Sequence, residues 1–190
     1  MLEDLFTRYG TDKGIWGYTQ AYETHLSPRR EQVRNVLEIG ICGYRDIPNN
    51  VVGASLFAWR DYFPGAVIDG LDNDSRFIFN DQDRIRTALC NAYDPASLGS
   101  ALSGFKFPKY DFICDDAVHD PLPQLYLFRM LWPFLQRGGV YAIEEACSYK
   151  CPNGNLDSMA SIIFSMFEDA KVREYRSHKP ESLLIIEKLP

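Results

Sequence analysis

Short apolar runs that alternate with helical stripes are the main pattern along the chain. The run Val-Arg-Asn-Val-Leu-Glu-Ile-Gly-Ile at 33–41 is typical of a strand that is buried on both faces and ends in a glycine turn. Leu56, Trp59 and Phe63 then recur at helical spacing, with Ser55 as a candidate cap. The same alternation predicts further strands at 66–71, 84–90, 110–114 and 140–143. It favours a parallel sheet with right-handed crossovers.

The C-terminal part of the chain changes the topology. Apolar stripes predict helices over 125–135 and 156–167, and two strand-like runs follow at 171–175 and 182–186. Only a polar turn separates these two runs, which is too short for a parallel crossover. The predicted fold is therefore α/β: a Rossmann-like seven-stranded, mostly parallel sheet with a C-terminal antiparallel hairpin and helices on both faces.

Composition narrows the function to small-molecule chemistry. The 190 residues suffice for one domain, and their net charge of −6 disfavours a nucleic acid or an anionic membrane as partner. The N-terminus lacks a secretory signal pattern, no apolar run approaches the roughly 20 residues that span a bilayer, and the five cysteines are odd in number. We therefore expect a cytoplasmic protein with a small-molecule partner, and the sequence leaves open a homo-oligomer.

The first predicted strand ends in a glycine-containing turn, and ligands of open α/β sheets bind at such carboxyl ends. Glu38, Gly40 and Gly43 stand there, although a buried turn that needs glycine explains the two glycines as well as a ligand does. Cys42 occupies the middle glycine of a dinucleotide fingerprint, and about a dozen residues separate Gly40 from the helix. The turn is thus poorly suited to a diphosphate.

The next two strand ends supply polar candidates for an adenosyl group. Asp72 follows the second strand, where a carboxylate would accept hydrogen bonds from both ribose hydroxyls; a turn-forming aspartate is the equal alternative. At the third strand end, Asn91 is placed to pair with an adenine edge and Tyr93 to pack on its face. These assignments rest on topology.

Carboxylates gather after the fourth and fifth strands. The fourth strand leads into Asp115, Asp116 and His119, and the fifth into Glu144 and Glu145. Like charges on adjacent strand ends favour a shared cation, and an oxygen-only set suits Mg²⁺. Such an ion would lower the pKa of a coordinated substrate hydroxyl, and His119 would accept its proton. Alternatively, the acids cap helices and line a cleft rim, and His119 is an ordinary surface imidazole.

These motifs, in this order, resemble the class I S-adenosylmethionine-dependent methyltransferases, and among them the macrolide-sugar O-methyltransferases of the mycinamicin and demethylmacrocin type. The similarity runs from Tyr9-Gly-Thr-Asp-Lys-Gly through Val36-Leu-Glu-Ile-Gly and Gly70-Leu-Asp to Asp115-Asp-Ala-Val-His and Gly138-Gly-Val-Tyr-Ala-Ile-Glu-Glu. It implies that residues 1–190 form one S-adenosylmethionine-binding domain, with 1–30 as an N-terminal lid.

The resemblance also completes the predicted site. Its cofactor-binding residues would be Thr11, Lys13, Glu38, Gly40, Gly43, Asp72, Asn91, Tyr93 and Asp115. Its metal ligands would be Asp115, Asp116 and Glu144, and its catalytic residues His119 and Asp116.

The expected activity is methyl transfer to a hydroxyl of a sugar or small natural product, assisted by Mg²⁺. Ala117, Val118 and Glu145 depart from the pattern of such enzymes, which usually have Gly-Ser and aspartate there. A catalytically degenerate methyltransferase fold that serves as a binding or regulatory module is therefore the alternative. A nicotinamide-dependent oxidoreductase is a third, and the missing middle glycine and the terminal hairpin disfavour it.

Overall fold

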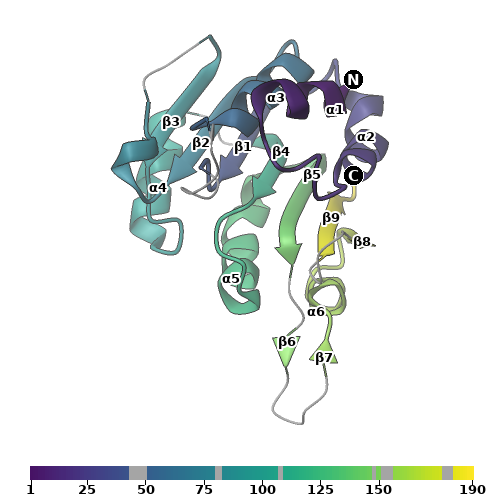
Figure 1. Ribbon diagram of the computed structural model, residues 1–190. Coiled ribbons are helices and arrows are strands. Elements are labelled where there is room, and N and C mark those ends of the chain that lie inside the picture. Colours follow the sequence, from purple (N-terminus) through teal and green to yellow (C-terminus); the bar gives the residue numbers. More distant parts are fainter. Residues whose placement is uncertain (43–50, 80–82, 107–108, 147–148, 151–155, 177–181) are drawn as a thin grey trace.

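The computed structural model describes residues 1–42, 51–79, 83–106, 109–146, 149–150, 156–176 and 182–190 (Figure 1). The strands are β1 (Asn35–Ile39), β2 (Val67–Asp72), β3 (Ile85–Leu89), β4 (Tyr110–Asp115), β5 (Leu135–Ala146), β6 (Tyr149–Lys150), β7 (Leu156–Asp157), β8 (Ala170–Arg176) and β9 (Ser182–Lys188). The α-helices are α1 (Leu2–Tyr9), α2 (Thr19–Leu26), α3 (Ala54–Tyr62), α4 (Pro95–Phe105), α5 (Pro121–Leu131) and α6 (Met159–Met166). Short 3-10 turns are η1 (Ser27–Arg29), η2 (Ser75–Phe77) and η3 (Trp132–Phe134). None of the described helices is long and apolar enough to cross a membrane.

Seven strands form one sheet in the order β3-β2-β1-β4-β5-β9-β8. Neighbouring strands from β3 to β5 pair in parallel, whereas β9 runs antiparallel to both β5 and β8. The strand order reverses at β1 and β4, so the switch point at which ligands bind lies at the carboxyl ends of these two strands. The predicted seven-stranded, mostly parallel sheet with its C-terminal hairpin is confirmed.

Helices cover both faces of the sheet (Figure 1). The apolar side chains of α1, α2 and α3 share a core with one face, around Trp59 and Phe112. Those of α4, α5 and α6 share a second core with the other face, around Phe128 and Tyr141. The two cores follow from strand geometry, because successive side chains of a strand point to opposite faces.

Aromatic packing ties the N-terminal helices to the sheet. Phe6 of α1 and Tyr22 of α2 pack edge-to-face on Trp59, with ring centroids 5.3 and 5.1 Å away, and Phe112 of β4 packs on the same ring at 5.2 Å. Each such pair adds about 0.5–1.5 kcal/mol beyond the burial of its area. The segment that joins α1 to α2 is thus fixed at both ends.

Some predicted element ends differ from the structure. The left-handed Gly53 precedes α3, so Ser55 lies inside the helix and does not cap it. Leu135 begins β5 instead of ending a helix, after Pro133, which cannot donate a helical hydrogen bond. Leu156 belongs to β7, and α6 begins only at Met159. Periodicity alone does not separate a short strand from the first turn of a helix.

Gly40 lets the chain leaving β1 pass directly against the chain leaving β4. Its φ is +82°, and an added Cβ would lie only 2.2 Å from the backbone oxygen of Asp116 and 2.9 Å from Cα of Ala117. Both neighbours are backbone atoms, which cannot rotate away. The glycine that the sequence offered as either a turn or a ligand contact is therefore required by the turn itself.

We expect Gly40→Ala to lower the free energy of unfolding by roughly 2–4 kcal/mol, because it combines a left-handed φ with a backbone clash. Urea denaturation of the purified protein measures the change. Gly99→Ala is the matched control: nothing lies within 4 Å of its added Cβ, and as a helix-interior substitution it should stabilise by about 0.5–1 kcal/mol. Equal stability of Gly40→Ala and the wild type would contradict the close approach.

Candidate functional site

A pocket of about 210 Å³ opens at the carboxyl ends of β1, β2, β3 and β4. Four predicted cofactor-binding residues line it together: Gly40, Asp72, Asn91 and Tyr93. Its other walls include apolar side chains and backbone from the same four strand ends and from η2: Ile39, Cys42, Leu71, Phe77, Cys90, Ala92, Ala117 and Val118. We call this the strand-end pocket.

A second pocket of about 350 Å³ adjoins the first, and the two share Cys42, Phe77, Asp116 and Ala117 as walls. Its acidic side is formed by Asp116, Glu144 and Glu145, with His119 beside them. The N-terminal segment contributes Asp12, Trp16 and Tyr18 to its walls. We call this the acidic pocket.

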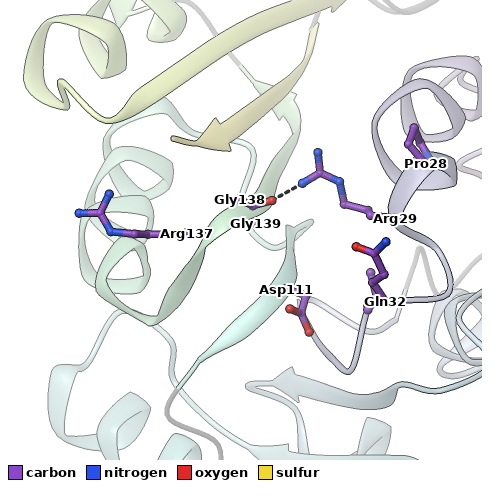
Figure 2. Close-up of a pocket in the computed structure, with 8 residues that line it drawn as sticks. Pro28, Arg29, Gln32, Asp111, Arg137, Gly138 and Gly139 are labelled. Atoms are coloured by element: carbon purple, nitrogen blue, oxygen red, sulfur yellow. Dashed lines mark hydrogen bonds between the residues drawn. The ribbon is translucent and has the colours of Figure 1, made fainter. Parts of the chain in front are cut away.

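A third hollow, of about 460 Å³, lies at the amino ends of the strands, next to the start of β4 and near the beginning of β5. Figure 2 shows that Arg29 reaches the backbone oxygen of Gly138 there, whereas Arg137 points away from Arg29. None of the predicted site residues that the structure describes lines this hollow. We therefore place the candidate site at the carboxyl ends of the strands.

Asp72 has the turn-forming role, one of the two alternatives that the sequence left open. Its Oδ2 accepts a hydrogen bond from the backbone N–H of Ile41 at 3.1 Å, and its Oδ1 accepts one from Asp74 at 3.0 Å. The carboxylate therefore holds the turns after β1 and β2 together. An ionised carboxylate has about four acceptor positions, so two backbone donors leave capacity for ligand hydroxyls.

Asn91 and Tyr93 form the far wall of the strand-end pocket. The side-chain oxygen of Asn91 accepts a hydrogen bond from the backbone N–H of Tyr93 at 3.2 Å, which shapes the turn after β3. Burial, and next the charge of Asp115, raise the pKa of Tyr93 to about 12, so its hydroxyl is protonated at neutral pH. The turn thus presents an amide and an aromatic ring to the pocket.

Lys13 carries its ammonium into the middle of a buried group of carboxylates. Nζ lies 3.1 Å from Oε1 of Glu38, 2.7 Å from Oδ2 of Asp116 and 2.9 Å from Oε1 of Glu144. The three acids come from β1, β5 and the residue after β4, which are neighbours in the sheet, and the Lys13 side chain is only 1% exposed. The sequence placed Lys13 against the cofactor; its contacts in the structure are with acids.

The ammonium decides how these acids ionise. Burial works to raise the pKa of Asp116, but Lys13 and the hydrogen bond from His119 outweigh it, so the pKa is lowered. Burial and the nearby charge of Asp116 raise the pKa of Glu144, which Lys13 only partly offsets. Lys13 itself resists the effect of burial because Asp116 and Glu144 hold its pKa well above the usual value.

Glu38 and its partners form the floor of this group. Its Oε2 accepts a hydrogen bond from the indole N–H of Trp59 at 3.1 Å, and the Ser55 hydroxyl also bonds to it. Glu38 is fully buried and lines neither of the two pockets. Among the described contacts it therefore supports Lys13, and its predicted contact with the cofactor stays a prediction.

A bulge in β5 aims two successive carboxylates at the same pocket. The register between β5 and β9 shifts between Ile143 and Ala146, and Glu145 has a φ of +48°. Regular alternation would send Glu144 and Glu145 to opposite faces; the bulge lets both line the acidic pocket. A left-handed glutamate is uncommon, and such strain concentrates at functional sites.

His119 lies between two of the acids. Its Nδ1 contacts Oε2 of Glu145, and its Nε2 lies 3.5 Å from Oδ1 of Asp116. The imidazole is about one-third exposed and faces the acidic pocket. It is thus accessible to a ligand and flanked by two carboxylates.

Asp115 lies apart from the other acids. It is the last residue of β4 and points to the face opposite Cys114, into the core that holds Tyr141. Its Oδ2 is buried without a hydrogen-bond partner, and burial raises the pKa of the carboxyl to about 7. Asp115 lines neither pocket, so its predicted contacts with the cofactor and metal stay predictions that the described contacts do not favour.

The oxygen donors of the acidic pocket fit a hard divalent cation chemically. Mg²⁺ takes carboxylate oxygens, and Asp116, Glu144 and Glu145 supply three carboxylates to one pocket. Within the described ranges, however, no three His, Cys, Asp or Glu side chains already converge as a metal site does. The carboxylates instead contact Lys13 and His119.

The remaining predicted residues fall in different places. Thr11 lines a small hollow of about 40 Å³ together with Gly40 and Asp116. Gly43 lies outside the described residues. Sequence reasoning missed Tyr22, whose hydroxyl donates a hydrogen bond to Oε1 of Glu144 and lies 3.6 Å from Sγ of Cys114. Its only signal was its place in the aromatic run after the Lys13 motif.

The comparisons with known proteins agree with this geometry. No protein-family model matches the chain. The 8-demethyl-8-alpha-L-rhamnosyl tetracenomycin-C 2'-O-methyltransferase of Streptomyces olivaceus is 35% identical over 147 residues, which cover 76% of this chain and 37% of that protein. The 3'-O-methyltransferase that acts on the 2-methoxy-rhamnosyl tetracenomycin in the same organism is 33% identical, and the match covers 93% of this chain and 46% of that protein.

Among solved structures, the MycE methyltransferase of mycinamycin biosynthesis, in complex with Mg and SAH, superimposes with a TM-score of 0.76 at 27% identity. The match covers 99% of this chain and 54% of that one. The chain thus spans about half the length of its relatives or less. With the sheet order and the strand-end pocket, these matches show that the chain belongs to the class I S-adenosylmethionine-dependent methyltransferase family, where it resembles the macrolide-sugar O-methyltransferases.

Proposed function

We propose that the chain transfers a methyl group from S-adenosylmethionine to a hydroxyl oxygen of a sugar or another small natural product. The observation that carries this proposal is the shared wall between the strand-end pocket and the acidic pocket, formed around Asp116 and Ala117. A cofactor in the first pocket would meet an acceptor hydroxyl in the second. The MycE structure is in complex with both Mg and SAH, which supports a methyl-donor cofactor and a divalent cation in one domain of this fold.

In the strand-end pocket, Asp72 would accept hydrogen bonds from the ribose hydroxyls. Asn91 would pair with the adenine edge, and Tyr93 would pack on the ring. The close turn at Gly40 would bring backbone against the cofactor, and Thr11 of the N-terminal segment lines a small hollow with Gly40. Residues 1–30, which include that segment, would act as the lid of this single domain.

In the acidic pocket, Asp116, Glu144 and Glu145 would hold a divalent cation, which would supply Lewis-acid activation of the acceptor hydroxyl. His119 would accept the hydroxyl proton. Its place in the wall of the acidic pocket, in contact with Glu145 and 3.5 Å from Oδ1 of Asp116, supports this role. Asp116 would thus serve both the metal and the base.

Replacement of Asp72 tests directly whether the strand-end pocket binds the cofactor. Titration calorimetry of the purified chain should show S-adenosylhomocysteine binding with a micromolar or lower Kd. We expect Asp72→Ala to weaken binding by roughly tenfold or more, since charge-assisted hydrogen bonds contribute about 1.5–3 kcal/mol. Asp83→Asn, which changes an exposed aspartate, should leave the Kd unchanged. Absence of heat from the wild type would refute the proposed cofactor.

Metal-binding measurements distinguish the carboxylates of the acidic pocket from Asp115. We expect Glu145→Gln to weaken Mn²⁺ binding at least tenfold, because it removes one carboxylate of the acidic pocket. Asp115→Asn should leave the Kd of Mn²⁺ within about twofold of the wild type, because Asp115 points into the other core. Electron paramagnetic resonance of free Mn²⁺ measures both. The reverse order of effects would restore Asp115 as the ligand.

Turnover distinguishes an enzyme from a degenerate binding module. With labelled S-adenosylmethionine and a panel of glycosylated acceptors, the wild type should transfer methyl groups. His119→Gln should lower kcat by roughly 10²–10⁴-fold and leave the Kd of S-adenosylhomocysteine unchanged, as removal of a general base does. Cofactor binding without transfer to any acceptor would favour the binding module instead.

A further inference from the structure

We propose that Lys13 is a positioning residue for the acidic pocket: its ammonium holds one oxygen each of Asp116 and Glu144 and thereby turns their other oxygens toward the cation. The proposal rests on the proposed metal-assisted function. It replaces the expectation that Lys13 contacts the cofactor, and it gives the N-terminal segment a role in building the site.

The oxygens that Lys13 contacts are individually defined. Its Nζ hydrogen-bonds to Oδ2 of Asp116, while Oδ1 of the same carboxylate lies on the side of His119. On Glu144, both Lys13 and the hydroxyl of Tyr22 contact Oε1. The described side-chain contacts of the Glu144 carboxylate are with Oε1, and Glu144 also lines the acidic pocket. The other oxygen of each carboxylate is therefore the one that the proposal assigns to the cation.

The hydrogen-bonding capacity of an ammonium group suits a site surrounded by several carboxylates. Two of the three N–H groups of Lys13 donate to Asp116 and Glu144, at 2.7 and 2.9 Å, and Glu38 lies 3.1 Å from the same nitrogen as an ion-pair partner. Glu38, the third acid, is itself held by Trp59 and Ser55. The Lys13 ammonium is therefore held against the sheet by Glu38, and its position does not depend on contacts within the acidic pocket.

Lys13 also joins the acids to the segment that covers them. The backbone N–H of Tyr18 donates to the oxygen of Lys13 at 3.2 Å, and Trp16 donates from its indole to Asp12 at 2.8 Å. Asp12, Trp16 and Tyr18 form the N-terminal wall of the acidic pocket. One residue therefore contacts the ligand carboxylates through its side chain and the opposite wall through its backbone.

Two possible effects of Lys13 on metal affinity, repulsion by its charge and positioning of the ligand oxygens, predict opposite results when the lysine is replaced. A positive charge beside a cation site repels the cation, so removing it should tighten metal binding. A group that orients ligand oxygens supports the site, and loss of such a contact typically weakens metal affinity about 10–100-fold. The sign of the change therefore decides between the two.

Mn²⁺ titrations of the full chain, with Lys13→Met and Tyr22→Phe beside the wild type, test the proposal. We expect Lys13→Met to raise the Kd of Mn²⁺ about 10–100-fold. Tyr22→Phe, which removes a donor to the same Glu144 oxygen without changing the charge, should raise it several-fold. Lys171→Met, on an exposed lysine of β8, is the charge control and should leave the Kd unchanged.

An unchanged or lower Kd in Lys13→Met would overturn the role of Lys13 while leaving the metal site standing. No Mn²⁺ binding by the wild type would instead refute the metal-assisted function, and this proposal with it. Urea denaturation without metal reports whether each variant is folded. If Lys13→Met does not fold, Tyr22→Phe decides: a Kd equal to that of the wild type refutes the positioning of Glu144.

Discussion

The buried ammonium of Lys13 is the interaction on which the strand ends depend. Glu38, Asp116 and Glu144 come from adjacent strands of one sheet face and are all largely buried. Unpaired charges cannot be buried at acceptable cost, so this face requires an internal cation. Because Lys13 supplies it from the N-terminal segment, the sheet, the segment and the acidic pocket form one unit.

Strand geometry explains which acids belong to that unit. Glu38, Cys114 and Ala142 pair across β1, β4 and β5, and Asp116 and Glu144 continue the same row. Asp115, one residue earlier, points to the opposite core. Glu145 would do the same, but the bulge and its left-handed backbone return it to the pocket. The site therefore depends on one local exception to the alternation of the sheet.

The sequence predicts the sheet because period and order are local signals, and it predicts that Asp72, Asn91, Asp116 and Glu144 come at strand ends for the same reason. It does not predict the contact of Lys13 with Asp116, which lie 103 residues apart. Nor does a run of two glutamates reveal a bulge. Which of two adjacent acids faces a pocket depends on the residue at which the strand ends. Sequence patterns place strand ends only to within a few residues.

The most direct measurement is a crystal structure of the chain with S-adenosylhomocysteine and Mn²⁺, with anomalous scattering to locate the metal. We expect the ribose on Asp72, one anomalous peak beside Asp116, Glu144 and Glu145, and Lys13 still in contact with the far oxygens of Asp116 and Glu144. A peak at the present position of the Lys13 ammonium, with the lysine displaced, would contradict the account.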